Sequence, residues 1–132
     1  MKPNTPWLPV RAAAVNWQDD GTPHASEFDD IYYSRENGPG ECRHVFLAAN
    51  GLPARWQNHP GEHFTIAETG FGTGLNFLVT WKAWQALTGA RPRLHYLSFE
   101  NYPLAPADLQ RAFTQWPELG ASGEALLAQY PG

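Results

Sequence analysis

Three glycines stand at alternate positions between residues 70 and 74, at the junction of two segments with different hydrophobic patterns. The preceding run His63–Ala67 is typical of a buried strand, and apolar residues from Leu75 onward recur at helical spacing. Glycine at a strand-to-helix turn permits backbone conformations that a Cβ would forbid, and lets a ligand lie against the main chain. The segment therefore predicts a ligand-binding turn at the start of a helix.

The segments after this helix predict a second strand and a second helix. Gly89 predicts the end of the first helix, Leu94–Phe99 is a second apolar strand, and Pro106 suits an early position in another helix. The order strand, helix, strand, helix is typical of an α/β domain with a parallel sheet.

The first third of the chain predicts a β-rich lead-in. Residues 10–26 predict a β-hairpin, and Ile31–Tyr33 predicts a short extended piece. Asn37–Gly40 is expected to break the chain before a short helix over Glu41–Ala49. Residues 53–63, which contain Pro, His and Gly, are expected to form a loop.

Two acidic residues flank the glycine-rich turn and restrict the ligand. Glu68 precedes the first glycine, and Glu100 follows the second strand, where a carboxylate can accept both hydroxyls of a ribose. A nicotinamide or flavin fingerprint needs a small residue where Leu75 stands, and a Walker loop needs a Lys, yet none occurs between Lys2 and Lys82. S-adenosylmethionine carries an ammonium, a sulfonium and a ribose but no phosphate, so it fits the acidic pattern best.

The charge distribution excludes a global nucleic-acid-binding face. The formal net charge is −4, and five acids lie between Arg11 and Arg35 with no Lys or Arg among them: Asp19, Asp20, Glu27, Asp29 and Asp30. The remaining eight acids and nine bases nearly balance, so any nucleic-acid partner needs a local basic patch.

Cysteine and histidine usage predicts no metal site. The single Cys42 excludes an internal disulfide, and it is expected to be a small buried residue. His59 and His63 have a metal-ligand spacing, but Pro60 and Gly61 between them forbid a regular helix. With no signal peptide and no apolar stretch near the ~20 residues of a membrane span, a cytoplasmic protein without a membrane partner is expected.

The segment Phe64–Leu78 resembles the first methyltransferase motif of the MnmC family. Members of this family are bifunctional enzymes of 5-methylaminomethyl-2-thiouridine synthesis in bacterial tRNA. Other segments resemble family segments in the family's order: Phe28–Ser34, Val45–Leu47 followed by Asn50, Leu97–Glu100 and Trp116–Leu119. The similarity spans most of residues 8–130.

The resemblance implies a Rossmann-like class I S-adenosylmethionine-dependent methyltransferase fold, incomplete at its C-terminus and with an N-terminal β-hairpin extension. Residues 1–55 would form the lead-in with its short helix, and residues 56–132 the first half of the core of one truncated domain. The implied reaction transfers a methyl group from S-adenosylmethionine to the amine of 5-aminomethyl(-2-thio)uridine at the wobble position of tRNA. The family's FAD belongs to a separate downstream oxidoreductase domain and is not expected here.

The resemblance also implies a set of cofactor-binding residues. Glu68 would lie near the methionine end of the cofactor, Glu100 would bind the ribose hydroxyls, and Asn101 stands where the family commonly has Lys. The remaining implied positions are the three glycines Gly70, Gly72 and Gly74, with Asn76, Tyr32 and Ser34.

No catalytic residue is assigned, because the family's later, substrate-side segments have no counterpart before Gly132. We therefore expect the isolated chain to bind cofactor at best, with little or no turnover, and tRNA to be a partner of the full-length protein. Two alternatives stay open: a non-catalytic nucleotide-binding module left by a gene break, and a fragment of an NAD- or FAD-dependent oxidoreductase. An incomplete sheet is also expected to give marginal stability or association.

Overall fold

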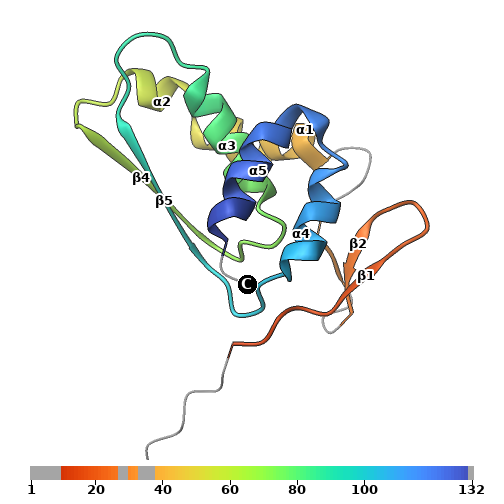
Figure 1. Ribbon diagram of the computed structural model, residues 1–132. Helices are drawn as coiled ribbons and strands as arrows, with labels where there is room; N and C mark the ends of the chain where they lie inside the picture. The colour runs from red at the N-terminus through yellow and green to blue at the C-terminus, as the bar shows by residue number, and fades with distance from the viewer. Residues whose placement is uncertain (1–9, 27–29, 33–37, 131–132) are drawn as a thin grey trace, which may run out of the picture.

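The computed structural model describes residues 10–26, 30–32 and 38–130, and it contains two small sheets and a layer of helices (Figure 1). One sheet pairs β4 (His63–Thr69) with β5 (Arg93–Phe99), and α3 (Leu75–Gln85) connects them. The strands run parallel in register from His63 opposite Arg93 to Thr69 opposite Phe99. The predicted parallel strand–helix–strand unit is thereby confirmed.

The two faces of this sheet differ in burial. On the inner face, Phe64 is buried, and Ile66 and Tyr96 are partly buried beneath the helices. On the outer face, Leu97 is 51% exposed and Phe99 is 67% exposed. Figure 1 shows α1 (Gly38–Cys42), α3 and α5 (Gly120–Gln129) on one side of β4 and β5. The inner face therefore forms the floor of the core.

One continuous core joins the helices to this inner face. Leu78 of α3 is fully buried, as is Leu109 of α4 (Pro106–Phe113). Trp56 contacts Phe64 edge to face, with ring centroids 6.2 Å apart, so the segment before β4 also packs onto the sheet. Further core members come from the loop after β5 and from the turn η3 (Pro117–Leu119) with the residue before it: Leu104, Trp116 and Leu119.

The predicted N-terminal hairpin is confirmed, and it docks on α4. Strands β1 (Val15–Trp17) and β2 (Pro23–Ala25) are antiparallel, and β3 (Asp30–Ile31) adds to β2. The indole N–H of Trp17 donates to Asp108 Oδ1 at 3.1 Å, while the Arg111 guanidinium lies 4.5 Å from the centre of the Trp17 ring.

The short helix expected over Glu41–Ala49 is present but starts earlier, and the loop expected over residues 53–63 is partly helical. The short helix begins at Gly38, inside the expected break, because Pro39 is tolerated in a first turn where its missing N–H is not needed. The helix continues as a π-helical turn η1 (Arg43–Leu47) and a 3₁₀ turn η2 (Ala48–Asn50). The expected loop contains the helical turn α2 (Ala54–Gln57), whose Trp56 is anchored in the core.

The first helix of the core also ends earlier than expected. Helix α3 stops at Gln85, and Gly89 lies in the following loop with φ of 80°. The Arg91 guanidinium donates to the carbonyls of Trp84 and Gln85, so this side chain caps the last turn of the helix.

The mixed α/β class is thus observed, while the complete Rossmann-like fold and the division at residue 55 stay predictions. The terminal Ser34 of the family-like segment lies outside the described residues. Among the described helices, none combines the length and the apolar character that crossing a membrane requires.

The one-sided sheet predicts contrasting effects of two leucine truncations. Leu78→Ala should lower the free energy of unfolding by about 2–5 kcal/mol, because it opens a cavity in a close-packed core. Leu97→Ala, on the exposed face, is the matched control and should cost less than about 1 kcal/mol. Urea unfolding followed by tryptophan fluorescence measures both. Equal losses for the two variants would contradict the assigned faces.

Candidate functional site

The glycine-rich turn lies at the carboxyl ends of both parallel strands. Gly70, Gly72 and Gly74 have φ values of 83°, 55° and 75°, in the left-handed region that favours glycine. Gly74 is the N-cap of α3, so the turn leads directly into the positive end of that helix. The sequence prediction of a strongly bent backbone between strand and helix is confirmed.

Glu100 ties this turn to the end of the neighbouring strand. Its Oε2 accepts the Gly72 N–H at 3.2 Å, and its Oε1 accepts the Tyr102 N–H at 3.1 Å. The Gly70 N–H also donates to the carbonyl of Phe99 at 2.7 Å. A carboxylate has about four acceptor sites, so each Glu100 oxygen retains a lone pair after these bonds. The carboxylate is therefore held in place and can still accept two hydroxyls.

A cavity of about 280 Å³ opens over the turn, which we call the glycine-loop cavity. It brings together five residues that the sequence singled out, and three that it did not. The lining residues are Tyr32, Gly70, Phe71, Gly72, Thr73, Leu75, Asn76 and Glu100. Its size approaches the lower end of the range for small-molecule sites.

Tyr32 reaches this cavity from the N-terminal sheet, far away in the sequence. Its Cδ1 atom lies 3.4 Å from the point that a Cβ on Gly72 would occupy. Burial raises the pKa of the Tyr32 hydroxyl, and the negative charges of Glu100 and Asp108 raise it further. The hydroxyl is therefore neutral at physiological pH and available as a hydrogen-bond donor.

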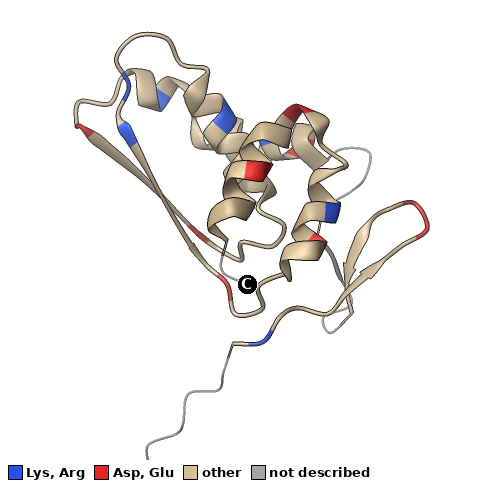
Figure 2. Cartoon of the chain, in the orientation of Figure 1, with Lys and Arg blue, Asp and Glu red and all other residues tan. Residues whose placement is uncertain are grey.

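Glu68 lies below the turn, on the same inner face of the sheet as Glu100, and it is not among the residues lining the cavity. Asn76 Nδ2 donates to Glu68 Oε2 at 3.3 Å, and Ser98 Oγ donates to Oε1 at 3.1 Å. Burial raises the pKa of Glu68 and the nearby charge of Glu100 adds to this, whereas hydrogen bonds from side chains including Asn76 and Ser98 oppose it. Figure 2 shows both strands ending in acidic residues at this edge.

The other sequence-predicted site residues are placed differently. Gly74 is buried behind the turn, where an added Cβ would meet Phe71 at 3.0 Å and Leu126 at 3.3 Å. Its role is therefore to let α5 pack closely. Asn101 is exposed in the turn after β5, so its expected cofactor contact stays a prediction. Ser34 lies outside the described residues.

Sequence reasoning missed the aromatic wall of this site. Phe71 stacks on Tyr130 at the end of α5, with ring centroids 6.5 Å apart, and the Tyr130 hydroxyl donates to the Leu104 carbonyl. Burial raises the pKa of Tyr130, as does Glu100. No local pattern signals this wall, because residue 130 reaches the turn only through the packing of α5.

Two other hollows have Phe46 in their linings. One, of about 220 Å³, adjoins the glycine-loop cavity through three shared residues, Tyr32, Leu75 and Asn76, and also includes Glu41 and Cys42.

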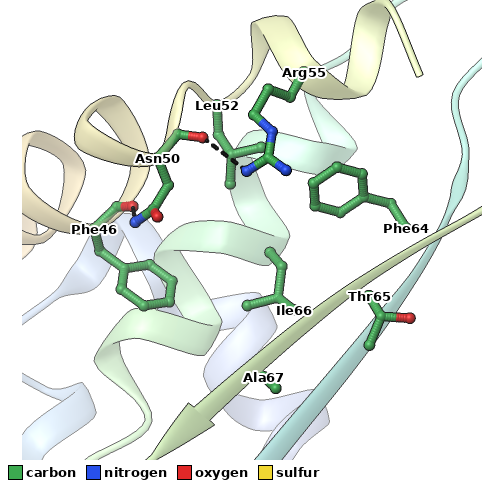
Figure 3. Close-up of a pocket in the computed structure, with 8 residues that line it drawn as sticks. All are labelled: Phe46, Asn50, Leu52, Arg55, Phe64, Thr65, Ile66 and Ala67. Atoms are coloured by element: carbon green, nitrogen blue, oxygen red, sulfur yellow. Dashed lines mark hydrogen bonds between the residues drawn. The ribbon is translucent and has the colours of Figure 1, made fainter.

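The other, of about 200 Å³, lies between β4 and the segment before it (Figure 3). Two of its polar side chains already bond to backbone carbonyls: Asn50 Nδ2 to Phe46 at 2.6 Å and Arg55 Nη1 to Asn50 at 3.2 Å. Arg55 also lies over the Phe64 ring, so Asn50 and Arg55 stabilise the fold through contacts within the chain.

Three of the five histidines lie together at the opposite end of the sheet. His63 Nδ1 and His95 Nε2 are 3.1 Å apart, and His59 Nε2 is 2.6 Å from the His63 carbonyl oxygen. Across the part of the chain that the structure describes, no group of three or more His, Cys, Asp or Glu is arranged to hold a metal ion.

The chain is similar to proteins named tRNA 5-methylaminomethyl-2-thiouridine biosynthesis bifunctional protein MnmC. It is 53% identical to the protein of Aeromonas salmonicida over 122 residues, which is 90% of this chain and 18% of that protein. It is 46% identical to the Legionella pneumophila protein over 131 residues, 97% of this chain and 20% of that one. It is 50% identical to the Methylobacillus flagellatus protein over 122 residues, which is 92% of this chain and 19% of that protein.

The chain thus spans about one fifth of the length of these relatives. No protein-family model matches it.

The raised pKa of Glu68 predicts a pH-dependent contribution to stability. A carboxyl whose pKa is higher in the native state than in the unfolded state binds protons on folding. Its contribution to stability is therefore present below the ordinary pKa of glutamate and is lost as pH rises through the raised pKa of the native state. Glu68→Gln, which cannot ionise, should therefore gain stability relative to the original chain as pH rises through that window. Urea unfolding at a series of pH values measures the difference.

Ser98→Ala sharpens this test. It removes a donor to the ionised carboxylate, so the pKa of Glu68 should rise further and the window should widen. Parallel stability curves for all three proteins would contradict the assignment.

Proposed function

Because this chain belongs to the MnmC family over the one fifth of its relatives' length that it spans, we propose that it binds S-adenosylmethionine in the glycine-loop cavity. It would form the cofactor side of a methyltransferase that acts on tRNA, with residues 56–132 as the first half of a Rossmann-like core. The observation that carries the proposal is the Glu100 carboxylate, anchored by two backbone N–H groups beside a glycine turn.

Each end of the cavity suits one part of this cofactor. The free lone pairs of Glu100 suit the two ribose hydroxyls, because a vicinal diol presents two parallel donors. Asn76, which lines the cavity and is bonded to Glu68 beneath it, suits the ammonium of the methionine end, and the negative charges of Glu68 and Glu100 oppose a pyrophosphate. Tyr32 reaches across the turn and would cover the cofactor.

The chemistry that S-adenosylmethionine supplies when bound is an electrophilic methyl group on a sulfonium. The chain's own residues would fix the direction in which that group points, since methyl transfer depends mainly on in-line positioning. An alkylammonium acceptor has a pKa of about 10, so it must lose a proton before its nitrogen can attack. We assign no residue of this chain to that proton. We propose that the remaining four fifths of the relatives' length provide the acceptor site, and expect little or no turnover from this chain alone.

Calorimetry with S-adenosylmethionine, S-adenosylhomocysteine and NAD tests the proposal directly. The first two should bind and NAD should not. Binding of NAD alone would replace the proposal with an oxidoreductase fragment, and binding of none of the three would overturn it.

Glu100→Gln should weaken S-adenosylmethionine binding about 10- to 100-fold, because hydrogen bonds to a charged acceptor contribute about 1.5–3 kcal/mol. Glu62→Gln is the matched control: Glu62 is exposed in the loop before β4, at the opposite end of the sheet, and its replacement should leave affinity unchanged. Equal affinities of the two variants would exclude Glu100 as the ribose-binding residue.

A pair of glycine variants separates the site from backbone strain. Gly72→Ala and Gly89→Ala both place a Cβ at positive φ and should each lose about 1 kcal/mol of stability. Only the alanine at 72 projects into the cavity, toward Tyr32, since nothing lies within 4 Å of a Cβ at 89. Calorimetry should therefore find binding impaired in Gly72→Ala and retained in Gly89→Ala. Similar affinities would show that the cavity is not the binding site.

A further inference from the structure

A chain of hydrogen bonds joins four elements beside the glycine turn: α1, α3, β4 and β5. The Cys42 thiol of α1 donates to Asn76 Oδ1 at 2.9 Å, and Asn76 Nδ2 of α3 donates to Glu68 Oε2 at 3.3 Å. Ser98 of β5 donates to the other oxygen of Glu68 at 3.1 Å. The thiol and the carboxylate are thus connected through a single amide group.

The thiol determines which way this amide faces. Cys42 is 7% exposed, and burial raises its pKa to about 12, with the negative charge of Glu68 adding to the rise and Arg43 opposing it. A protonated thiol donates, so the amide oxygen faces sulfur and the amide NH₂ faces the carboxylate. The reverse orientation would place the amide oxygen against the Glu68 oxygens and lose both bonds.

We propose that Cys42 is a positioning residue, whose thiol fixes the Asn76 amide and thereby orients the Glu68 carboxylate beneath the glycine-loop cavity. Asn76 lines both this cavity and the adjoining one that contains Cys42. The relevance to a ligand rests on the proposed function, whereas the orientation of Glu68 is a property of the free protein. The role goes beyond packing, because an apolar side chain of the same size cannot supply the donor.

Several titratable groups surround the Glu68 carboxyl and could affect its pKa. The titratable groups that face it are Cys42 from α1, Tyr96 from β5 and Glu100 from the turn after β5. Asn76 and Ser98 are neutral donors. Burial raises the pKa of Tyr96, and Glu68 raises it further, so Tyr96 remains neutral like Cys42. Cys42 and Tyr96 therefore carry no charge while Glu68 titrates, so they do not titrate together with it.

Three variants test the role through the pKa of Glu68, measured by NMR titration of the carboxyl carbon in the full chain. Cys42→Ala removes the donor and should shift this pKa upward, because the amide can then turn away from the ionised carboxylate. Cys42→Ser keeps a donor of similar size and should restore the original value. Asn76→Leu should shift the pKa as Cys42→Ala does, and the double variant should add little further, since both act through one connection.

Ligand affinity gives the second readout. If S-adenosylmethionine binds, Cys42→Ala should weaken it about 3- to 10-fold at neutral pH, and Cys42→Ser should recover most of the loss. An unchanged pKa of Glu68 in Cys42→Ala would overturn the role even if that variant melts at a lower temperature. A shifted pKa in a chain that does not bind S-adenosylmethionine would support the role and reject the proposed function.

Discussion

The arrangement of the site depends on one carboxylate. Glu100 accepts one N–H from the glycine turn and one from the turn after β5, so a single side chain joins the loops that follow two parallel strands. Parallel strands bring their carboxyl ends to one edge of the sheet, but they do not determine how the loops beyond them are held. The Glu100 bonds and the Gly70 bond to Phe99 provide that constraint. The cavity exists because the glycine turn is held against the end of the second strand.

A second group of polar side chains, Glu68, Asn76 and Ser98, lies next to the glycine turn. Glu68 is partly withdrawn from water, which disfavours its charge, and side-chain donors from α3 and β5 compensate part of that cost. The cost is consistent with a functional site, where buried ionisable groups are commonly kept for their chemistry. Two carboxylates on one face of the sheet also give this edge a negative potential, which favours a cationic ligand over an anionic one.

The rest of the described fold supports the site from one side. Helices cover the inner face of β4 and β5, and the N-terminal hairpin is fixed to α4 by Trp17, whose indole bonds to Asp108. The segment that follows the hairpin carries Tyr32 to the cavity. The outer face retains exposed Leu97 and Phe99, whereas parallel strands are usually covered on both faces. Association of the chain in solution stays a prediction.

Local sequence was sufficient to predict the strand–helix–strand unit of β4, α3 and β5, and most residues of the candidate site. Alternating apolar residues, a glycine-rich turn and helical periodicity are all signals within about ten residues, so β4, α3, β5 and the hairpin were predictable. Glu68 and Glu100 could be selected because each directly follows or ends a strand. The helix at Gly38 and the turn at Ala54 were missed, because burial of Cys42 and Trp56 overrides glycine and proline signals there.

The sequence by itself therefore determined that two acids and three glycines gather at one edge of a parallel sheet. Only the tertiary structure decided how they are connected: Glu100 bonded to the turn, Glu68 turned beneath it, and Cys42 linked to Glu68 through Asn76. It also brought Tyr32 to the cavity from the N-terminal third of the chain, and it stacked Tyr130, which follows α5, on the cavity residue Phe71. The physical reason is that these contacts join residues 28 or more positions apart, apart from the Asn76–Glu68 bond, and no local pattern encodes the packing that brings them together.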